Sequence, residues 1–197
     1  MVESSFEKLK LSSARIGVFG GVLWLFFMAD WILPVDLRRW GIIPRELGGL
    51  WGILFSPFLH GDLSHLLSNF LPLMILLALL LVTQKQGWLI VMQIVLIGGV
   101  LLWVFGRPAV HIGASGLIYG LIAYLMAAGF RQGRFGPALA ALLVGFLYGG
   151  TLLSGVLPSV GEQVSWDGHL TSAIAGGLLG YFSTSLGQAP IAQEPVI

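Results

Sequence analysis

Six apolar runs of nearly bilayer-spanning length constrain this chain more than any other feature of its sequence. A helix needs about 20 mostly apolar residues to cross the hydrocarbon core of a membrane. The runs are Ile16–Leu33, Leu66–Val82, Trp88–Phe105, Ile112–Phe130, Ala138–Val156 and Leu170–Leu186. Only 10% of the 197 residues are charged, whereas soluble domains average about 25%. The sequence therefore predicts an all-α, polytopic membrane protein with six transmembrane helices.

The spans leave little chain for anything else, so we expect one membrane domain with short ends. The expected parts are a cytoplasmic N-terminal segment at residues 1–15, the membrane domain at residues 16–186 and a disordered tail at residues 187–197. The long connection between the first two spans contains the apolar stretch Leu50–Leu59. This stretch is too short to cross and is interrupted by Pro57, so we expect it in or on the membrane interface.

Charge and cysteine content narrow the orientation and the class of partner. Cytoplasmic loops carry an excess of Lys and Arg, and a cytoplasmic N-terminus would place six basic residues inside against four outside. We therefore expect both termini in the cytoplasm. The net charge of +1 argues against nucleic acid as a partner, and the absence of Cys excludes disulfides and thiolate sites. The sequence indicates no oligomeric state.

Polar side chains gather at one end of the predicted bundle. They are His60, His65 and Asn69 near the second span, His111 and Ser115 near the fourth, and Asp167 and His169 near the sixth. Even-numbered spans all begin on the same side, so these groups share one depth near the outer face. Polar groups at such positions are costly and indicate function. One histidine alone would be an ordinary interfacial side chain, but the set can supply a nucleophile, a base and oxyanion donors.

Ser115 is the candidate nucleophile, and His169 is the candidate base. Ser115 stands in Gly113-Ala114-Ser115-Gly116, where it opens a helix behind a glycine turn. Backbone N–H groups at a helix start favour a developing oxyanion. For this motif alone, a helix-capping serine or a small helix-contact residue is the simpler alternative. His169 is suitably placed because its helix begins on the same side.

Small residues recur every four positions on the two helices expected to carry Ser115 and His169. They are Gly116 and Gly120 on the fourth span, and Ser172, Gly176 and Gly180 on the sixth. Such ridges let two helix backbones approach closely, which would bring the two side chains together. Helix packing without catalysis explains the same pattern, and the two explanations are compatible.

His65 and Asn69 lie four residues apart and therefore share one helix face. An imidazole and a carboxamide aimed at one point suit oxyanion donation better than metal binding. A zinc site made of His60, His65 and His169 stays open as an alternative, although the spacing supplies no local set of three or four ligands. We expect no metal and no cofactor.

These motifs, His60-x4-His65-x3-Asn69, Gly113-Ala114-Ser115-Gly116 and then His169, resemble in order the rhomboid family of intramembrane serine proteases. The likeness runs from about Pro44 to Gly180 and includes Tyr119. It implies a six-helix bundle around a water-filled cavity in a bacterial inner membrane, with the active site open to the outer side. It also implies hydrolysis of transmembrane protein substrates within the lipid bilayer.

The resemblance also assigns roles to single residues. Ser115 and His169 would form a catalytic dyad without an aspartate. His65, Asn69 and the Ser115 backbone N–H would hold the oxyanion, while Gly113 supports the turn. Tyr119 would pack against the His169 ring, and His60 would support the first loop. Asp167, two residues before His169, is expected at the surface and outside the site.

Two positions depart from the family pattern. Trp51 is followed by Gly52, where the family often has an arginine that ties down the first loop, and Ser172 replaces a usual glycine. The alternative function is a non-catalytic rhomboid-like protein that binds membrane clients, but such a protein would be expected to lack Ser115 or His169. A transporter would place ionisable groups near the midplane, where the sequence offers mainly Gln93.

Overall fold

The computed structural model describes residues 5–132, 139, 142–143, 146–147, 150, 155–158 and 164–186. Its long helices are α1 (Ser5–Ile32), α3 (Leu63–Thr83), α4 (Gly87–Phe105), α5 (Ser115–Gln132) and α7 (Trp166–Leu186). Between α1 and α3 lie the short helices η1 (Leu37–Trp40), η2 (Leu47–Leu50), α2 (Gly52–Phe55) and η3 (Ser56–Phe58). Within the described residues there is no strand, only one isolated bridge between Ile42 and His111. The predicted all-α membrane bundle is confirmed.

The long helices coincide with five of the six predicted spans. By length and composition, Ser13–Ile32, Leu63–Thr83 and Gly87–Phe105 could each cross a membrane, and Ser115–Arg131 is a shorter apolar helix. The helix α1 begins at Ser5, well before the apolar run that predicted it. Most of the predicted fifth span, residues 138–156, and the whole tail at residues 187–197 lie outside the described residues.

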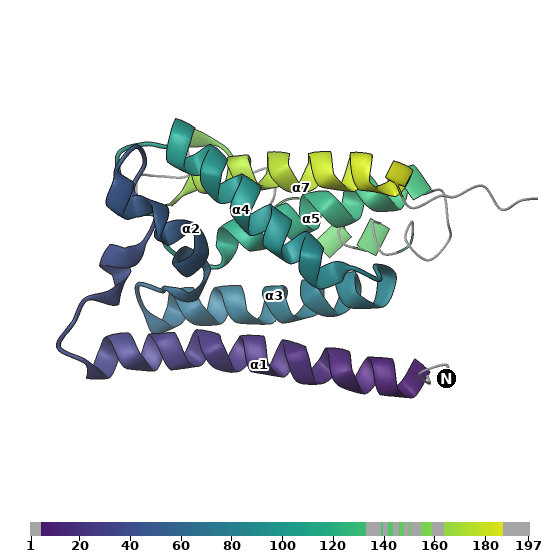
Figure 1. The fold of residues 1–197 in the computed structure, drawn as a ribbon, viewed down its shortest axis with the longest axis horizontal. Helices are drawn as coiled ribbons and strands as arrows, with labels where there is room; N and C mark the ends of the chain where they lie inside the picture. The colour runs from purple at the N-terminus through teal and green to yellow at the C-terminus, as the bar shows by residue number, and fades with distance from the viewer. Residues whose placement is uncertain are drawn as a thin grey trace, which may run out of the picture.

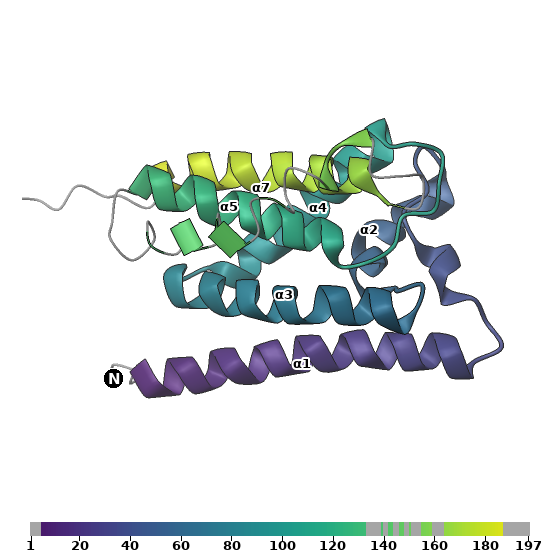
Figure 2. The ribbon, with the colours of Figure 1, turned by 180° about the vertical axis from the view of Figure 1, so that it is seen from behind.

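The helices form a layered bundle in which α1 lies at one edge, beside α3 (Figure 1). On the other side of α3 lie α4, α5 and α7, and Figure 2 shows the same order from behind. The starts of α3, α5 and α7 lie at the end where α1 finishes, together with the short helices (Figures 1 and 2). The parity of the spans predicts this shared end, and it gathers the polar side chains of the sequence there.

The core is a leucine-rich cluster centred on α3. Leu66, Leu73, Leu76, Leu77 and Leu80 are fully buried, and their spacing of three, four and seven residues keeps them on one side of the helix. They pack with buried residues of α1, α4 and α5 in one cluster, and the partly buried Leu179 of α7 packs against it. Many other apolar side chains remain exposed, as expected where lipid replaces water around a protein.

The closest helix contact joins α5 and α7 through small residues. A Cβ added to Gly176 would overlap the Gly120 backbone, and a Cβ on Gly120 would lie 3.0 Å from the carbonyl oxygen of Ser172. A Cβ on Gly116 would lie 3.2 Å from Ser172 Oγ, and one on Gly180 would lie 2.6 Å from the α5 backbone. All five small residues singled out in the sequence therefore lie in this contact, which brings the two backbones together.

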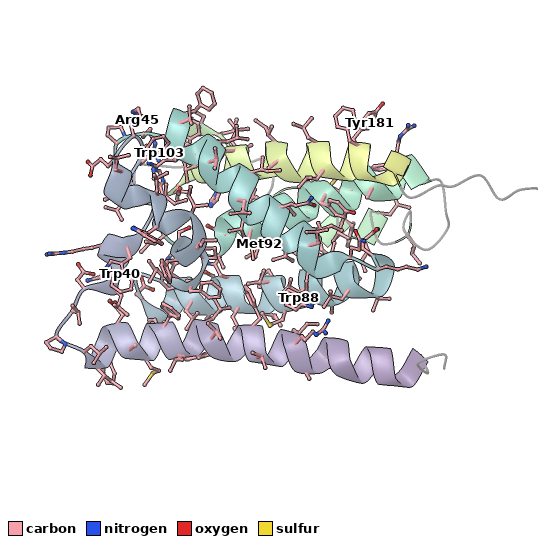
Figure 3. The ribbon with its side chains drawn as sticks, viewed as in Figure 1. Trp40, Arg45, Trp88, Met92, Trp103 and Tyr181 are labelled. Carbon is pink, nitrogen blue, oxygen red and sulfur yellow. The ribbon has the colours of Figure 1, made fainter. Side chains whose placement is uncertain are left out.

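The first loop, residues 33–62, is tied to the end of α4 by Arg45. Its guanidinium donates to the carbonyl oxygens of Val104 at 3.2 Å and Gly106 at 2.8 Å. In return, Trp103 Nε1 donates to the carbonyl oxygen of Glu46 at 2.8 Å. Figure 3 shows Arg45 and Trp103 side by side at this end of the bundle. The loop therefore has an arginine tie, although not at the position where the family often has one.

Position 52 itself has no room for an arginine. A Cβ added to Gly52 would overlap the backbone of Gly41 and Ile42. Gly52 therefore departs from the family pattern as the sequence indicates, and Arg45 ties the loop from a different place in the chain. The sequence pattern missed it because the carbonyl groups that Arg45 binds carry no side-chain signal.

Candidate active site

Ser115 and His169 meet at the shared end of α5 and α7. Ser115 is the first residue of α5, and His169 lies in the first turn of α7. The distance from His169 Nε2 to Ser115 Oγ is 2.9 Å, which is a hydrogen bond. His169 is buried, whereas Ser115 is half-buried. The hydroxyl is thus paired with a base and still partly accessible.

The other ring nitrogen of His169 fixes which nitrogen carries the proton. His169 Nδ1 lies 2.9 Å from the carbonyl oxygen of Gly155. A carbonyl oxygen can only accept, so Nδ1 must donate, and the neutral ring then leaves Nε2 as an acceptor. Nε2 can therefore receive the Ser115 hydroxyl proton, which is the tautomer that a general base needs.

Tyr119 and Gly155 hold the imidazole ring from two sides. The rings of Tyr119 and His169 are stacked, with centroids 4.1 Å apart and planes 3° apart. A Cβ on Gly155 would overlap the Tyr119 hydroxyl, so a larger residue at position 155 would displace the Tyr119 side chain. No sequence signal marks Gly155, because its contribution to the site is a backbone carbonyl.

His65 and Asn69 border the turn that precedes Ser115. Gly113 has a φ of 108°, a backbone conformation that favours glycine. A Cβ there would lie 2.7 Å from His65 Nε2 and 3.6 Å from Asn69 Nδ2. Asn69 Nδ2 is buried and has no hydrogen-bond partner among the described residues. Buried donors are normally paired, so this amide is a donor without an acceptor beside the candidate nucleophile.

His60 supports the same turn. Its ring is 2% exposed, and Nε2 accepts the backbone N–H of Ala114 at 3.4 Å. The ring also meets the His65 ring edge-on, with centroids 5.1 Å apart. The pKa of His60 is lowered to about 4, mainly because the ring is buried and to a smaller extent because His65 lies nearby. His60 is therefore neutral at pH 7, and it joins the first loop to the turn before Ser115 rather than supporting the loop alone.

Asp167 is buried, which corrects the expectation that it lies at the surface. It is 5% exposed, and one carboxylate oxygen accepts the backbone N–H of Arg107 at 2.8 Å. The sequence missed this because the two residues are 60 positions apart. The Nδ1 of His169 is bonded to Gly155 instead, so these contacts form no Ser-His-Asp triad.

A small cavity of about 40 Å³ adjoins Ser115 and His169. His111 and Ser165 are among its polar lining residues. Most of its lining is apolar, and the polar groups of Ser115, His169, His111 and Ser165 give a water molecule in a cavity of this size possible hydrogen-bond partners. Among the described residues, no three His, Asp or Glu side chains are arranged to hold a metal ion, so the zinc alternative has no support there.

Comparisons with known proteins found a matching family model and several similar proteins. A family model described as the Rhomboid domain matches residues 47–185. An uncharacterized protein of Mycobacterium tuberculosis is 36% identical over 180 residues, covering 87% of this chain and 75% of that protein. An uncharacterized protein of Mycobacterium leprae is 37% identical over 180 residues, covering 87% of this chain and 71% of that protein. The matched range includes His60 through His169, and this chain belongs to the rhomboid family.

Proposed function

We propose that this chain is an intramembrane serine protease that hydrolyses peptide bonds in or near transmembrane segments of membrane proteins. Rhomboid proteins are typically proteases of this kind, although the family includes inactive members. The observation that carries the proposal is the 2.9 Å contact between Ser115 Oγ and His169 Nε2, with Nδ1 bonded to the Gly155 carbonyl. A serine hydroxyl is a weak nucleophile until a base accepts its proton.

The first half of the reaction forms a covalent intermediate. Ser115 Oγ attacks the scissile carbonyl carbon while its proton passes to His169 Nε2, and the carbonyl oxygen becomes an oxyanion. The imidazolium then gives that proton to the amide nitrogen, the C–N bond breaks, and the amine product leaves. The N-terminal part of the substrate remains as an ester on Ser115.

The second half releases this ester with water. A water molecule gives one proton to His169 Nε2 and attacks the ester carbon, and the new tetrahedral intermediate expels Ser115 Oγ. The oxygen recovers its proton from the imidazolium as the carboxylic acid product departs. The small cavity beside the two residues is the site from which we expect the water to come.

The oxyanion of both steps needs donors that are already in place. The candidates are Asn69 Nδ2, His65 Nε2 and the backbone N–H of Ser115, all beside the Gly113 turn. The unpaired state of Asn69 Nδ2 among the described residues supports this role, because a preorganised donor loses no protein partner when the oxyanion forms.

We propose that both termini lie in the cytoplasm of a bacterial inner membrane and that the site opens to the outer side. The sequence contains no Cys, so a single introduced cysteine reports one position. Arg39 has an 83% exposed side chain at the site end. In intact cells, Arg39→Cys should react with a membrane-impermeant thiol reagent. Labelling only after the cells are broken would reverse the orientation.

The substrate must offer an extended backbone to the dyad, whereas a transmembrane helix hides its peptide groups in hydrogen bonds. We therefore expect cleavage where small or helix-weakening residues lie near the outer face. The test uses the purified protein in liposomes with a single-span substrate of this kind. Wild type should cleave it and Ser115→Ala should not. Binding without cleavage by wild type would favour the non-catalytic, client-binding alternative.

A further inference from the structure

A partly buried polar cluster lies beside the dyad and takes no part in the chemistry described above. At its centre, the Asp167 carboxylate accepts the Arg107 backbone N–H at 2.8 Å and contacts the guanidinium at 3.3 and 3.4 Å. The Arg107 guanidinium also donates to the Val164 carbonyl oxygen at 2.9 Å and lies 5.2 Å from the Trp166 ring centre. Arg107 and Asp167 are thus each held by several contacts.

His111 extends the cluster. Its Nε2 lies 3.1 Å from the Arg107 carbonyl oxygen, so Nε2 donates. Its Nδ1 lies 2.6 Å from Ser165 Oγ and 3.7 Å from an Asp167 carboxylate oxygen. Ser165 and Asp167 therefore face the same ring nitrogen. A catalytic triad needs them on opposite nitrogens, so Ser165 is not a second nucleophile.

The cluster joins three segments that meet at the site. Arg107 and His111 belong to the segment that leads into Ser115, and Asp167 lies two residues before His169 on α7. The third segment is the first loop, because Ile42 and His111 exchange backbone hydrogen bonds of 3.0 and 2.9 Å. The side chains of Arg107, His111 and Asp167 therefore link the segment before Ser115 to the start of the helix that carries His169.

The packing of α5 on α7 does not by itself fix how far one helix slides along the other. Small residues set a short distance between the two backbones, but they offer few large side chains to interlock along the axis. The contact between Ser115 and His169 depends on that axial register, since a displacement of about 1 Å in a catalytic group can cost about 100-fold in rate. The Asp167 carboxylate is buried while the Arg107 side chain is 33% exposed, and a shift of α7 that separated the two would leave the buried carboxylate unpaired.

We propose that Arg107, His111 and Asp167 are positioning residues that set the register of Ser115 against His169. The inference rests on the proposed protease function. The three side chains bind no substrate in this account. They hold the α5 and α7 starts in the one arrangement in which the hydroxyl and the imidazole meet.

The test compares two Asp→Asn variants at the same end of the molecule. Asp167→Asn keeps the shape and an acceptor for the Arg107 N–H, but it removes the ion pair between the buried carboxylate and the partly exposed guanidinium. Asp36→Asn removes the exposed ion pair with Arg38, whose atoms are 2.8 Å apart. We expect Asp167→Asn to slow labelling of Ser115 by a fluorophosphonate at least about 10-fold and to lower kcat without changing KM. Asp36→Asn should match wild type.

A double-mutant cycle and a stability control separate positioning from loss of fold. Arg107→Gln combined with Asp167→Asn should be no slower than the worse single variant, because both remove one interaction. Leu77→Ala opens the core away from the site and lowers the unfolding temperature. Assayed well below that temperature, it should label at the wild-type rate. If Leu77→Ala lost labelling to a similar extent, instability alone would explain the effect of Asp167→Asn, and the proposal would be overturned.

A readout without activity keeps this proposal distinct from the protease function. The chain has four histidines, so ¹⁵N-histidine labelling yields few ring signals. In wild type, His169 should show a protonated Nδ1, and in Asp167→Asn it should show a tautomer mixture. Suppose that Asp167→Asn loses the single His169 tautomer but the fluorophosphonate does not label wild type. This result would support the positioning role and contradict the protease function. An unchanged His169 tautomer in Asp167→Asn, with wild-type labelling, would overturn the positioning role.

Discussion

The helices α7 and α1 pack against the bundle in opposite ways. On α7, small residues such as Gly176 lie directly on the α5 backbone. On α1, at the edge of the bundle (Figure 1), Val18, Leu25 and Trp31 are 65–78% exposed, while Leu23 is fully buried. One helix is placed with the accuracy that a hydrogen-bonded dyad requires, and the other presents its surface to lipid. Changes at the α7 contact should therefore alter chemistry, whereas matched changes on α1 should not.

The largest effect is expected where α3 reaches the site. Asn69→Ala removes the buried donor that has no partner among the described residues, and loss of one oxyanion donor typically costs about 10²–10³ in rate. The matched control is Ser68→Ala, since Ser68 is exposed and its hydroxyl donates to the His65 carbonyl oxygen of its own helix. Cleavage rates in liposomes check both variants. A wild-type rate for Asn69→Ala would remove this residue from the oxyanion site.

The same glycine-to-alanine change on α7 and α1 tests the comparison itself. A Cβ on Gly176 would overlap the Gly120 backbone, whereas a Cβ on Gly21 of α1 meets nothing within 4 Å. Gly176→Ala should separate α5 from α7 and reduce cleavage by about 100-fold, because the dyad contact lengthens. Gly21→Ala should keep the wild-type rate. Equal rates in the two variants would show that the dyad does not depend on the close α5–α7 contact.

A smaller effect should appear in the pH dependence of stability. The folded pKa of His60 is about 4, below its ordinary value of 6.5, mainly because the ring is buried. Between pH 6.5 and 4 the unfolded chain binds more protons, so the free energy of unfolding falls as the pH falls through this window. His60→Gln should weaken that fall, measured as unfolding temperatures at pH 7 and pH 4.5. An equally steep fall in both proteins would contradict the buried, neutral ring.

Much of the site follows from the sequence, for physical reasons that apply to particular residues. Ser115, His169, His65 and Asn69 are polar side chains at the starts of apolar spans, and the parity of the spans alone puts them at one end. The small residues on α5 and α7 carry their own periodic signal. These features depend on side-chain type and spacing, which a sequence shows directly.

Other features depend on contacts that a sequence does not display. Gly155 contributes a carbonyl oxygen, which every residue has, and only the structure shows that it meets His169 Nδ1. Asp167 looks like an exposed residue before a helix until Arg107, far away in the chain, is seen beside it. The early start of α1 at Ser5 was missed because a helix continues past its apolar run.

The central claim is that His169 activates the Ser115 hydroxyl, and the most direct measurement is the rate at which a fluorophosphonate labels Ser115. Mass spectrometry should locate the adduct on Ser115 in wild type. His169→Ala should suppress labelling although the hydroxyl is still present, because an unassisted serine is too weak a nucleophile near neutral pH. Unfolding temperatures near that of wild type would show that the variant is folded. Labelling of folded His169→Ala at the wild-type rate, or an adduct on another serine in wild type, would contradict the account.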